Sequence, residues 1–205
     1  MTVRGRRIMS TMPAASTPSR QRVPAAERRD ALIDAAVIEF AHSGLYGTPV
    51  DRIARRVGVA QPYVFSLFAN KRELFLAAVA RSFHLVGGTF EQAAAAYGEG
   101  ALPECEDVFQ ALGEAYLELL ESDRAWLMVQ HHAYAACDDD VVRDRVRSLY
   151  AELVAQVQRL SGADDERVDE FFRYGMWLNV AAAMGVADLS ASCEWMRAEA
   201  RAGSA

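Results

Sequence analysis

Cysteine is scarce in this sequence, and long apolar runs are missing. The three cysteines, Cys105, Cys137 and Cys193, are an odd number without the paired spacing of a zinc site, so we expect neither a disulfide framework nor bound metal. No apolar run approaches the ~20 residues that a membrane helix requires. With 52% hydrophobic and 24% charged residues, the 205-residue chain has the composition of a globular protein, which we expect in a reducing cytoplasm without membrane contact.

Motifs for catalysis are also missing. The sequence contains no phosphate-binding loop, nucleophile elbow, HExxH pair or dinucleotide fingerprint. His131 and His132 are adjacent, so on a helix they point about 100° apart and do not form a two-ligand face. We therefore expect no enzyme activity, no cofactor and no metal. A motif-poor all-α enzyme and a helical adaptor that does not bind DNA are the alternatives.

Charge is distributed unevenly along the chain. Residues 1–72 hold twelve basic and five acidic residues, whereas the remainder holds ten basic and 23 acidic ones. This difference indicates that only the first third approaches a polyanion. Residues 1–20 are expected to form a disordered basic arm, or to be leader sequence upstream of a start at Met9 or Met12.

Helical periodicity extends through the whole chain. Apolar residues repeat at helical spacing from Ile33 to Ala41, and Gly44 follows as a stop signal. We expect a helix over about 49–57, with Thr48 as N-cap and Pro49 at its first position, and further helices over 61–68, 71–86, 104–121, 123–136, 139–160, 164–187 and 191–202. Gly87-Gly88 is expected to interrupt the fourth helix. The predicted fold class is all-α.

Residues 50–68 have the spacing of a helix-turn-helix. Ala54 is the small residue that lets two helices cross, and Gly58 supplies the turn four positions later. Ile53, Val57, Val59 and Val64 are predicted to form the core between them. A tight helical hairpin inside a bundle would give the same pattern, so this spacing is only moderate evidence for DNA binding.

The sequence over about residues 28–79 resembles the N-terminal domain of the tetracycline-repressor (TetR) family. The residues that carry the resemblance are Arg28-Arg29, the helix 32–40, Ser43-Gly44-Leu45-Tyr46, Thr48-Pro49-Val50, Ile53-Ala54, Gly58-Val59, Val64-Phe65 and Phe68-Ala69-Asn70-Lys71-Arg72-Glu73-Leu74. Beyond residue 80 the similarity is architectural only. The resemblance implies a three-helix DNA-binding domain at 21–70, followed by a helical effector-binding and dimerisation domain at 71–205.

The same resemblance implies which residues meet DNA. Thr48 and Lys71 fall at phosphate-contacting positions, and the recognition helix presents Gln61, Pro62 and Tyr63. The full set of expected DNA-contacting residues is Arg22, Arg28, Arg29, Thr48, Pro49, Gln61, Pro62, Tyr63, Phe65 and Lys71. Phe65 and Leu67 stand where the family often has tyrosine and histidine, so these two side chains either touch DNA without polar contacts or pack inside. Ala60 replaces the usual capping Ser or Thr.

The middle of the chain has residues suited to a largely apolar effector pocket. Aromatic rings and polar tips alternate with small alanines, and the expected pocket residues are Tyr116, Trp126, His131, Tyr134 and Trp177. The same residues also suit a plain hydrophobic core.

A homodimer is expected, because one short recognition helix reads too few base pairs by itself. The family resemblance implies that the helices 139–160 and 164–187 of the two chains pair as a four-helix bundle. The expected contact residues are Leu149, Leu153, Phe171, Gly175, Leu178, Ala182 and Gly185. The predicted function is therefore a ligand-responsive regulator, in the family's commoner form a repressor, that binds a palindromic double-stranded operator and is released by a small, largely apolar effector.

Overall fold

The computed structural model describes residues 24–186, and all regular elements in that range are α-helices. The predicted all-α fold is confirmed there. The helices are α1 (Ala25–Gly47), α2 (Val50–Val57), α3 (Gln61–Leu67), α4 (Lys71–Gly98), α5 (Val108–Ser122), α6 (Ala125–Ala135), α7 (Asp140–Ser161) and α8 (Asp165–Ala183). The basic arm, Arg22 and the helix expected at 191–202 lie outside the described residues. None of the helices in the described part is long and apolar enough to span a membrane.

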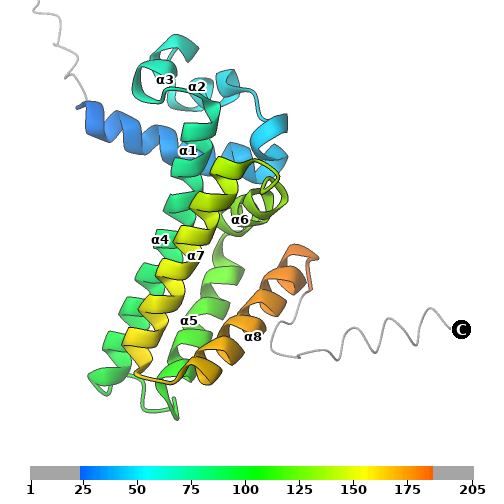
Figure 1. Cartoon of the computed structure of the whole chain (residues 1–205). Coiled ribbons are helices and arrows are strands. Elements are labelled where there is room, and N and C mark those ends of the chain that lie inside the picture. The colour runs from blue at the N-terminus through cyan, green and yellow to red at the C-terminus, as the bar shows by residue number, and fades with distance from the viewer. Residues whose placement is uncertain (1–23, 187–205) are drawn as a thin grey trace, which may run out of the picture.

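The helices form a head and an elongated body (Figure 1). The head contains α1, α2 and α3. The 28-residue α4 runs from the head to the opposite end of the body, about 42 Å at 1.5 Å per residue, with α7 beside it (Figure 1). Helix α6 packs against α1 and α4, so the body is joined to the head at two places. One continuous cluster of buried apolar residues extends through both parts, including the edge-to-face pair of Phe40 and Phe75 at 5.0 Å.

Local sequence signals explain most helix ends. Asn70 caps α4 as predicted, because its side chain accepts a hydrogen bond from the Glu73 N–H at 2.9 Å. Glu73 in turn accepts from the Ala69 N–H at 2.6 Å, a reciprocal arrangement close to a capping box. Gly44 leaves the helical conformation with a φ of 64°, which places a kink near the end of α1 where the stop signal was expected.

Two predictions about helix ends are wrong. Thr48 does not cap α2: the N-cap is Pro49, and Thr48 donates its hydroxyl to the carbonyl oxygen of Glu39 at 3.2 Å. Gly87-Gly88 does not interrupt α4, which continues to Gly98. Gly87 is buried, and its carbonyl oxygen accepts a hydrogen bond from Gln156 on α7 at 3.2 Å, so the missing side chain permits close helix packing there.

Candidate functional site

The helix-turn-helix is built as its sequence spacing predicts. Gly58 adopts the left-handed conformation with a φ of 72°, and its N–H closes the end of α2 on the carbonyl oxygens of Ala54 and Arg55. Ile53, Ala54 and Val64 are fully buried between α2 and α3. Val57 and Val59 are partly buried and pack against the same cluster. This small core fixes the crossing of the two helices, which leaves the other side of α3 at the surface.

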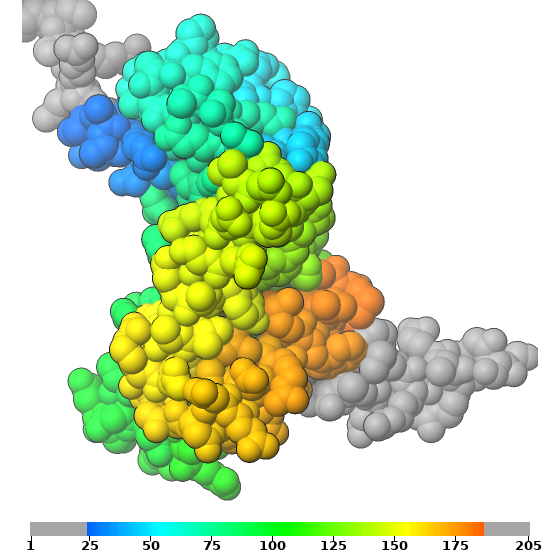
Figure 2. Space-filling view, in the orientation of Figure 1, coloured from blue at the N-terminus to red at the C-terminus, as the bar shows by residue number. Residues whose placement is uncertain are grey.

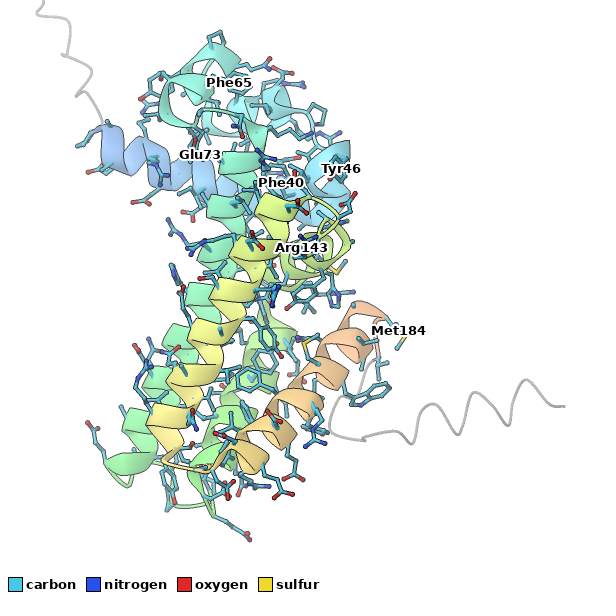
Figure 3. All side chains as sticks on the ribbon, in the orientation of Figure 1. Phe40, Tyr46, Phe65, Glu73, Arg143 and Met184 are labelled. Atoms are coloured by element: carbon cyan, nitrogen blue, oxygen red, sulfur yellow. The ribbon has the colours of Figure 1, made fainter. Side chains whose placement is uncertain are left out.

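Helix α3 presents one continuous polar and aromatic surface. Gln61, Pro62 and Tyr63 are exposed at its start, and Phe65 follows with 43% of its surface accessible. Figure 3 shows Phe65 in the head, at the end of the molecule far from Met184. Leu67 is only partly exposed and packs against the core. Of the two residues whose role was open, Leu67 therefore packs inside and Phe65 does not.

The residues that flank α3 differ in whether they are free to contact DNA or are already bonded within the chain. Pro49 and Arg29 are exposed, and the Arg29 guanidinium lies 4.6 Å from the centre of the Phe68 ring, with the half-buried Arg28 beside it. Lys71 donates from Nζ to the Tyr46 carbonyl oxygen at 3.2 Å, and partial burial lowers its pKa. Two ammonium hydrogens of Lys71 remain for a phosphate.

Thr48 departs from the expected phosphate contact. It is buried, and its single hydroxyl hydrogen is already donated to Glu39. A phosphate oxygen can only accept, so the Thr48 side chain has nothing left to offer it. The phosphate contact of Thr48 stays a prediction, and the hydrogen bond to Glu39 argues against a contact through its hydroxyl.

A buried carboxylate, missed at the sequence level, organises the basic face of α2. Glu39 on α1 is 4% exposed and forms ion pairs with Arg56 at 2.7 Å and Arg52 at 3.5 Å. The Arg52 and Arg56 side chains are 50% and 43% exposed, so they hold α2 on α1 while remaining about half in solvent. Glu39 falls on the apolar face of α1 at helical spacing from Ala36 and Ala35, and that position was the only signal in the sequence.

The turn between α6 and α7 contacts the head directly. Arg72 at the start of α4 forms an ion pair with Asp139 at 2.8 Å, and Asp139 also caps α7 by accepting from the N–H groups of Val141 and Val142. These hydrogen bonds, the one from Arg72 first, hold the pKa of Asp139 below its usual value. The hydroxyl of Tyr46 lies 3.4 Å from the Asp138 carboxylate.

The body contains a narrow aromatic cavity of about 50 Å³, lined by residues of α4, α5, α6, α7 and α8. Its aromatic lining is Phe83, Phe90, Tyr116, Tyr134, Tyr150, Phe171, Phe172 and Tyr174. Gln130 and Asn179 supply polar groups, and no lining residue carries a charge. Burial raises the pKa of Tyr116 and Tyr134 far above the usual range, so both hydroxyls stay protonated.

The structure places only part of the predicted pocket at this cavity. Tyr116 and Tyr134 line it, as expected. Trp126 is 3% exposed and packs its ring against Tyr116 at 6.0 Å, one layer behind the wall. His131 lies 3.2 Å from the Asn179 carbonyl oxygen through Nε2, and Trp177 is half-buried; neither is among the lining residues. Gln130 and Asn179 were missed, because a polar residue in an apolar helix is not distinctive in one sequence.

The residues predicted for the dimer contact are mostly inside the chain itself. Leu149, Leu153, Leu178 and Ala182 are buried in the core of a single chain. Phe171 and Gly175 line the cavity, and Gly185 is exposed beyond the end of α8. Apolar side chains of α8 that are exposed are instead Tyr174 and Val180, with Met184 at its C-cap.

One cluster in the described part of the chain has the composition of a metal site. Possible ligand atoms of Glu104, Cys105 and Glu114 lie within 4.8 Å of one another. The Cys105 thiol approaches the Glu114 carboxylate at 3.6 Å, and burial together with the neighbouring carboxylates raises the pKa of the thiol. A protonated thiol is a poor metal ligand, so the cluster is most simply a hydrogen-bonded pair. That this chain binds no metal remains a prediction.

Comparison with known families agrees with this geometry. Residues 32–78 match the model of the bacterial regulatory proteins of the tetR family. The matched residues thus carry the N-terminal domain of that family. The family model describes regulatory proteins, and the curated relative is named as a transcriptional activator. The match begins in the middle of α1 and ends within the second turn of α4.

A curated relative and several solved structures are similar to this chain. The transcriptional activator FasR of Mycolicibacterium smegmatis is 38% identical over 77 residues, which cover 37% of this chain and 35% of FasR. The matched region thus spans about a third of that relative.

The similarity to solved structures extends to the body. The regulator FadR of Bacillus subtilis, solved with stearoyl-CoA, is 18% identical with a TM-score of 0.62 over 79% of this chain and 91% of FadR. A regulator of Pseudomonas aeruginosa PAO1 is 22% identical, with a TM-score of 0.60 over 89% and 94% of the two chains. At these identities the likeness concerns the fold.

Proposed function

We propose that this chain is a ligand-responsive repressor of the TetR family, which binds a palindromic operator as a homodimer and is released by a small, largely apolar effector. We also propose a division of the chain into a DNA-binding unit over 21–70 and an effector-binding and dimerisation unit over 71–205. The observation that carries the proposal is the direct contact between a wall of the cavity and the DNA-binding head through α6 and the turn after it.

The DNA-facing part of the proposal rests on the exposed surface of α3. A recognition helix must leave several side chains free to enter the major groove, and α3 leaves Gln61, Pro62, Tyr63 and Phe65 free. Gln61 is suited to a bidentate contact with adenine, and the two aromatic rings to thymine methyl groups or sugars. Around α3, the phosphate contacts are assigned to Lys71, Arg28 and Arg29, together with Arg22, and Pro49 abuts the backbone. The hydroxyl of Thr48 is left out.

The effector part rests on the route from the cavity to the head. Gln130 and Tyr134 line the cavity from α6, and the turn that follows α6 holds Tyr46 and Arg72 through Asp138 and Asp139. A ligand that displaces α6 therefore moves two anchors of the head. It lowers DNA affinity only if it binds better to the arrangement in which the two heads of the dimer no longer fit one operator. Solved structures of this fold include one with stearoyl-CoA and one, EbrR, with imidazole.

An activator is the second candidate, because the relative FasR is named as one. Both candidates predict the same DNA contacts and differ only in the position of the operator relative to the promoter. A reporter gene placed behind the chain's own operator separates them: deleting the regulator raises expression for a repressor and lowers it for an activator.

The experiment for DNA binding is fluorescence anisotropy with duplex DNA selected by the full chain from a random pool. Tyr63→Ala is expected to weaken binding at least tenfold, because base contacts are worth about 1–3 kcal/mol each, while the mass of the dimer stays unchanged. Gln92→Ala, an exposed site on α4 outside the head, is the matched control and should bind like the unmodified chain. Equal affinity of the Tyr63→Ala variant would remove α3 from the interface.

A further inference from the structure

The polar groups at the cavity are unequally satisfied. Their oxygen acceptors are occupied: the Asn179 Oδ1 accepts from the hydroxyl of Tyr116, and the Gln130 Oε1 accepts from the hydroxyl of Tyr134 at 3.5 Å. The Gln130 Nε2 amide, by contrast, has no hydrogen-bond partner, although Gln130 is 3% exposed. A buried donor without a partner costs the protein free energy, and such groups are rare unless something else satisfies them.

A second unpartnered donor lies one helical turn away. The indole Nε1–H of Trp126 also has no partner, and Trp126 is 3% exposed. Residues four apart on a helix share a face, so both spare donors lie along the same side of α6. Of the two, only Gln130 lines the cavity; Trp126 stands behind Tyr116.

The rest of the cavity excludes a charged ligand. None of its lining residues is acidic, basic or a histidine, and eight are aromatic. A carboxylate or ammonium group would lose its hydration there without gaining an ionic partner. Aromatic faces and edges instead favour a flat or apolar body.

We propose that the cavity recognises a neutral, largely apolar compound through a carbonyl-type hydrogen-bond acceptor, which accepts from the Nε2 amide of Gln130. Ketones, esters, lactones and amides have this chemistry. The inference rests on the proposed function only in taking this cavity as the effector site. Because α6 carries both Gln130 and the turn that holds Asp139, the acceptor is bound by the helix that also contacts the head.

The test compares probes of one shape by isothermal titration calorimetry on the full chain without DNA. Benzophenone offers an acceptor, diphenylmethane offers neither acceptor nor donor, diphenylamine offers a donor, and 4-benzoylbenzoate adds a charge. Benzophenone is expected to bind about tenfold more tightly than diphenylmethane, since a hydrogen bond that satisfies a buried donor is worth about this factor. Diphenylamine and 4-benzoylbenzoate are expected to bind more weakly than benzophenone.

Three variants locate the preference for benzophenone at Gln130. Gln130→Leu keeps the bulk of the side chain but removes the donor, so it should abolish the preference for benzophenone over diphenylmethane and leave diphenylmethane binding unchanged. Gln92→Leu makes the same change at an exposed position of α4 and should keep the preference. Gly113 lines the cavity with open space beside it, so Gly113→Leu should block benzophenone altogether.

Several outcomes overturn the inference. These are equal binding of benzophenone and diphenylmethane, tighter binding of diphenylamine or 4-benzoylbenzoate, a preference that survives Gln130→Leu, or no binding of any probe. None of these ligand-binding outcomes bears on operator binding, which is measured separately. Conversely, benzophenone binding through Gln130 without any change in DNA affinity would support the ligand chemistry and contradict the regulatory proposal.

Discussion

The side chain of Glu39 connects the structure of the head to its charge. A carboxylate buried on the apolar face of α1 is stable only if it is paired, and the pairing with Arg52 and Arg56 joins α1 to α2. The same carboxylate neutralises part of the basic surface beside α3. The net positive charge of the N-terminal third, counted from the sequence, is therefore larger than the charge available to DNA.

Glu39→Gln is expected to lower the free energy of unfolding by about 1–2 kcal/mol, because it weakens charge-assisted hydrogen bonds at a buried site. Urea denaturation measures this change. Asp51→Asn breaks the exposed ion pair with Arg55 on the same helix and should stay within about 0.5 kcal/mol of the unmodified chain. Equal effects of the two substitutions would show that Glu39 does not hold α2 in place.

Asp139 gives the contact between head and body a defined pH dependence. Its pKa is held below the usual value, chiefly by the hydrogen bond from Arg72, so its contribution to stability is present above about pH 4 and is lost as the pH falls through the lowered pKa. Asp139→Asn keeps the cap on α7 but removes the charge.

We expect the unmodified chain to be more stable than Asp139→Asn at pH 7 and the difference to shrink towards pH 3. Urea midpoints at the two pH values measure it. The matched control, Asp140→Asn, affects a carboxylate that is largely in solvent and pairs only with Arg143, so it should show a smaller difference at pH 7. A stability difference at Asp139 that does not depend on pH would contradict the ion pair with Arg72.

Among the elements, α4 shows that packing between helices can outweigh local helix propensity. Two adjacent glycines are unfavourable in a helix by about 1 kcal/mol each, and this cost predicts a break. Close packing against α7 outweighs it: a β-carbon on Gly87 would lie 2.6 Å from the Gln156 side chain, whereas one on Gly88 would meet nothing within 4 Å. The packing of α4 on α7 therefore explains the glycine at position 87. Nothing in the structure explains the glycine at position 88.

Gly88→Ala is expected to raise the free energy of unfolding by up to about 1 kcal/mol through helix propensity alone. Gly87→Ala should gain less or lose stability, because the new methyl group displaces the Gln156 amide from the Gly87 carbonyl oxygen and from Glu91. Thermal unfolding of the pair measures the difference. A larger gain at Gly87 than at Gly88 would contradict the packing of α4 on α7.

The elements that sequence predicted best are those fixed by local chemistry. Asn70, Gly58 and the apolar positions Ile53, Ala54 and Val64 each act within a few residues, so the helix-turn-helix was predictable from spacing. The cavity was predicted only in outline, because Gln130 and Asn179 are brought together by α6 and α8, 49 residues apart in the chain. Long-range pairs such as Arg72 and Asp139 leave no periodic signal in one sequence.

At the scale of the whole molecule, the contact surface of the proposed dimer is also difficult to predict from one sequence. Apolar residues at helical spacing on α7 and α8 suit either the chain's own core or a contact between two chains. The structure uses Leu149, Leu153, Leu178 and Ala182 for its own core. Figure 2 shows α7 and α8 adjacent on one face of the body. The exposed apolar residues of α8 and its C-cap, Tyr174, Val180 and Met184, are the ones we propose for the contact.

The paired substitution Val180→Arg and Met184→Arg is expected to convert the proposed dimer to a monomer, because it places two like charges of each chain at the proposed contact. Light scattering after size exclusion measures the mass. Gln92→Arg adds a charge on an exposed face of α4 and should leave the mass unchanged. A dimeric paired variant would move the interface away from α8.

The proposed function requires two heads to read one operator together. Selecting duplex DNA from a random pool with the full chain, free of ligand, tests it most directly. We expect enrichment of an inverted repeat whose two half-sites have their centres about one helical turn apart, ~34–36 Å, because each copy of α3 enters a successive major groove. Enrichment of a single asymmetric site, or no enrichment at low salt, would contradict it.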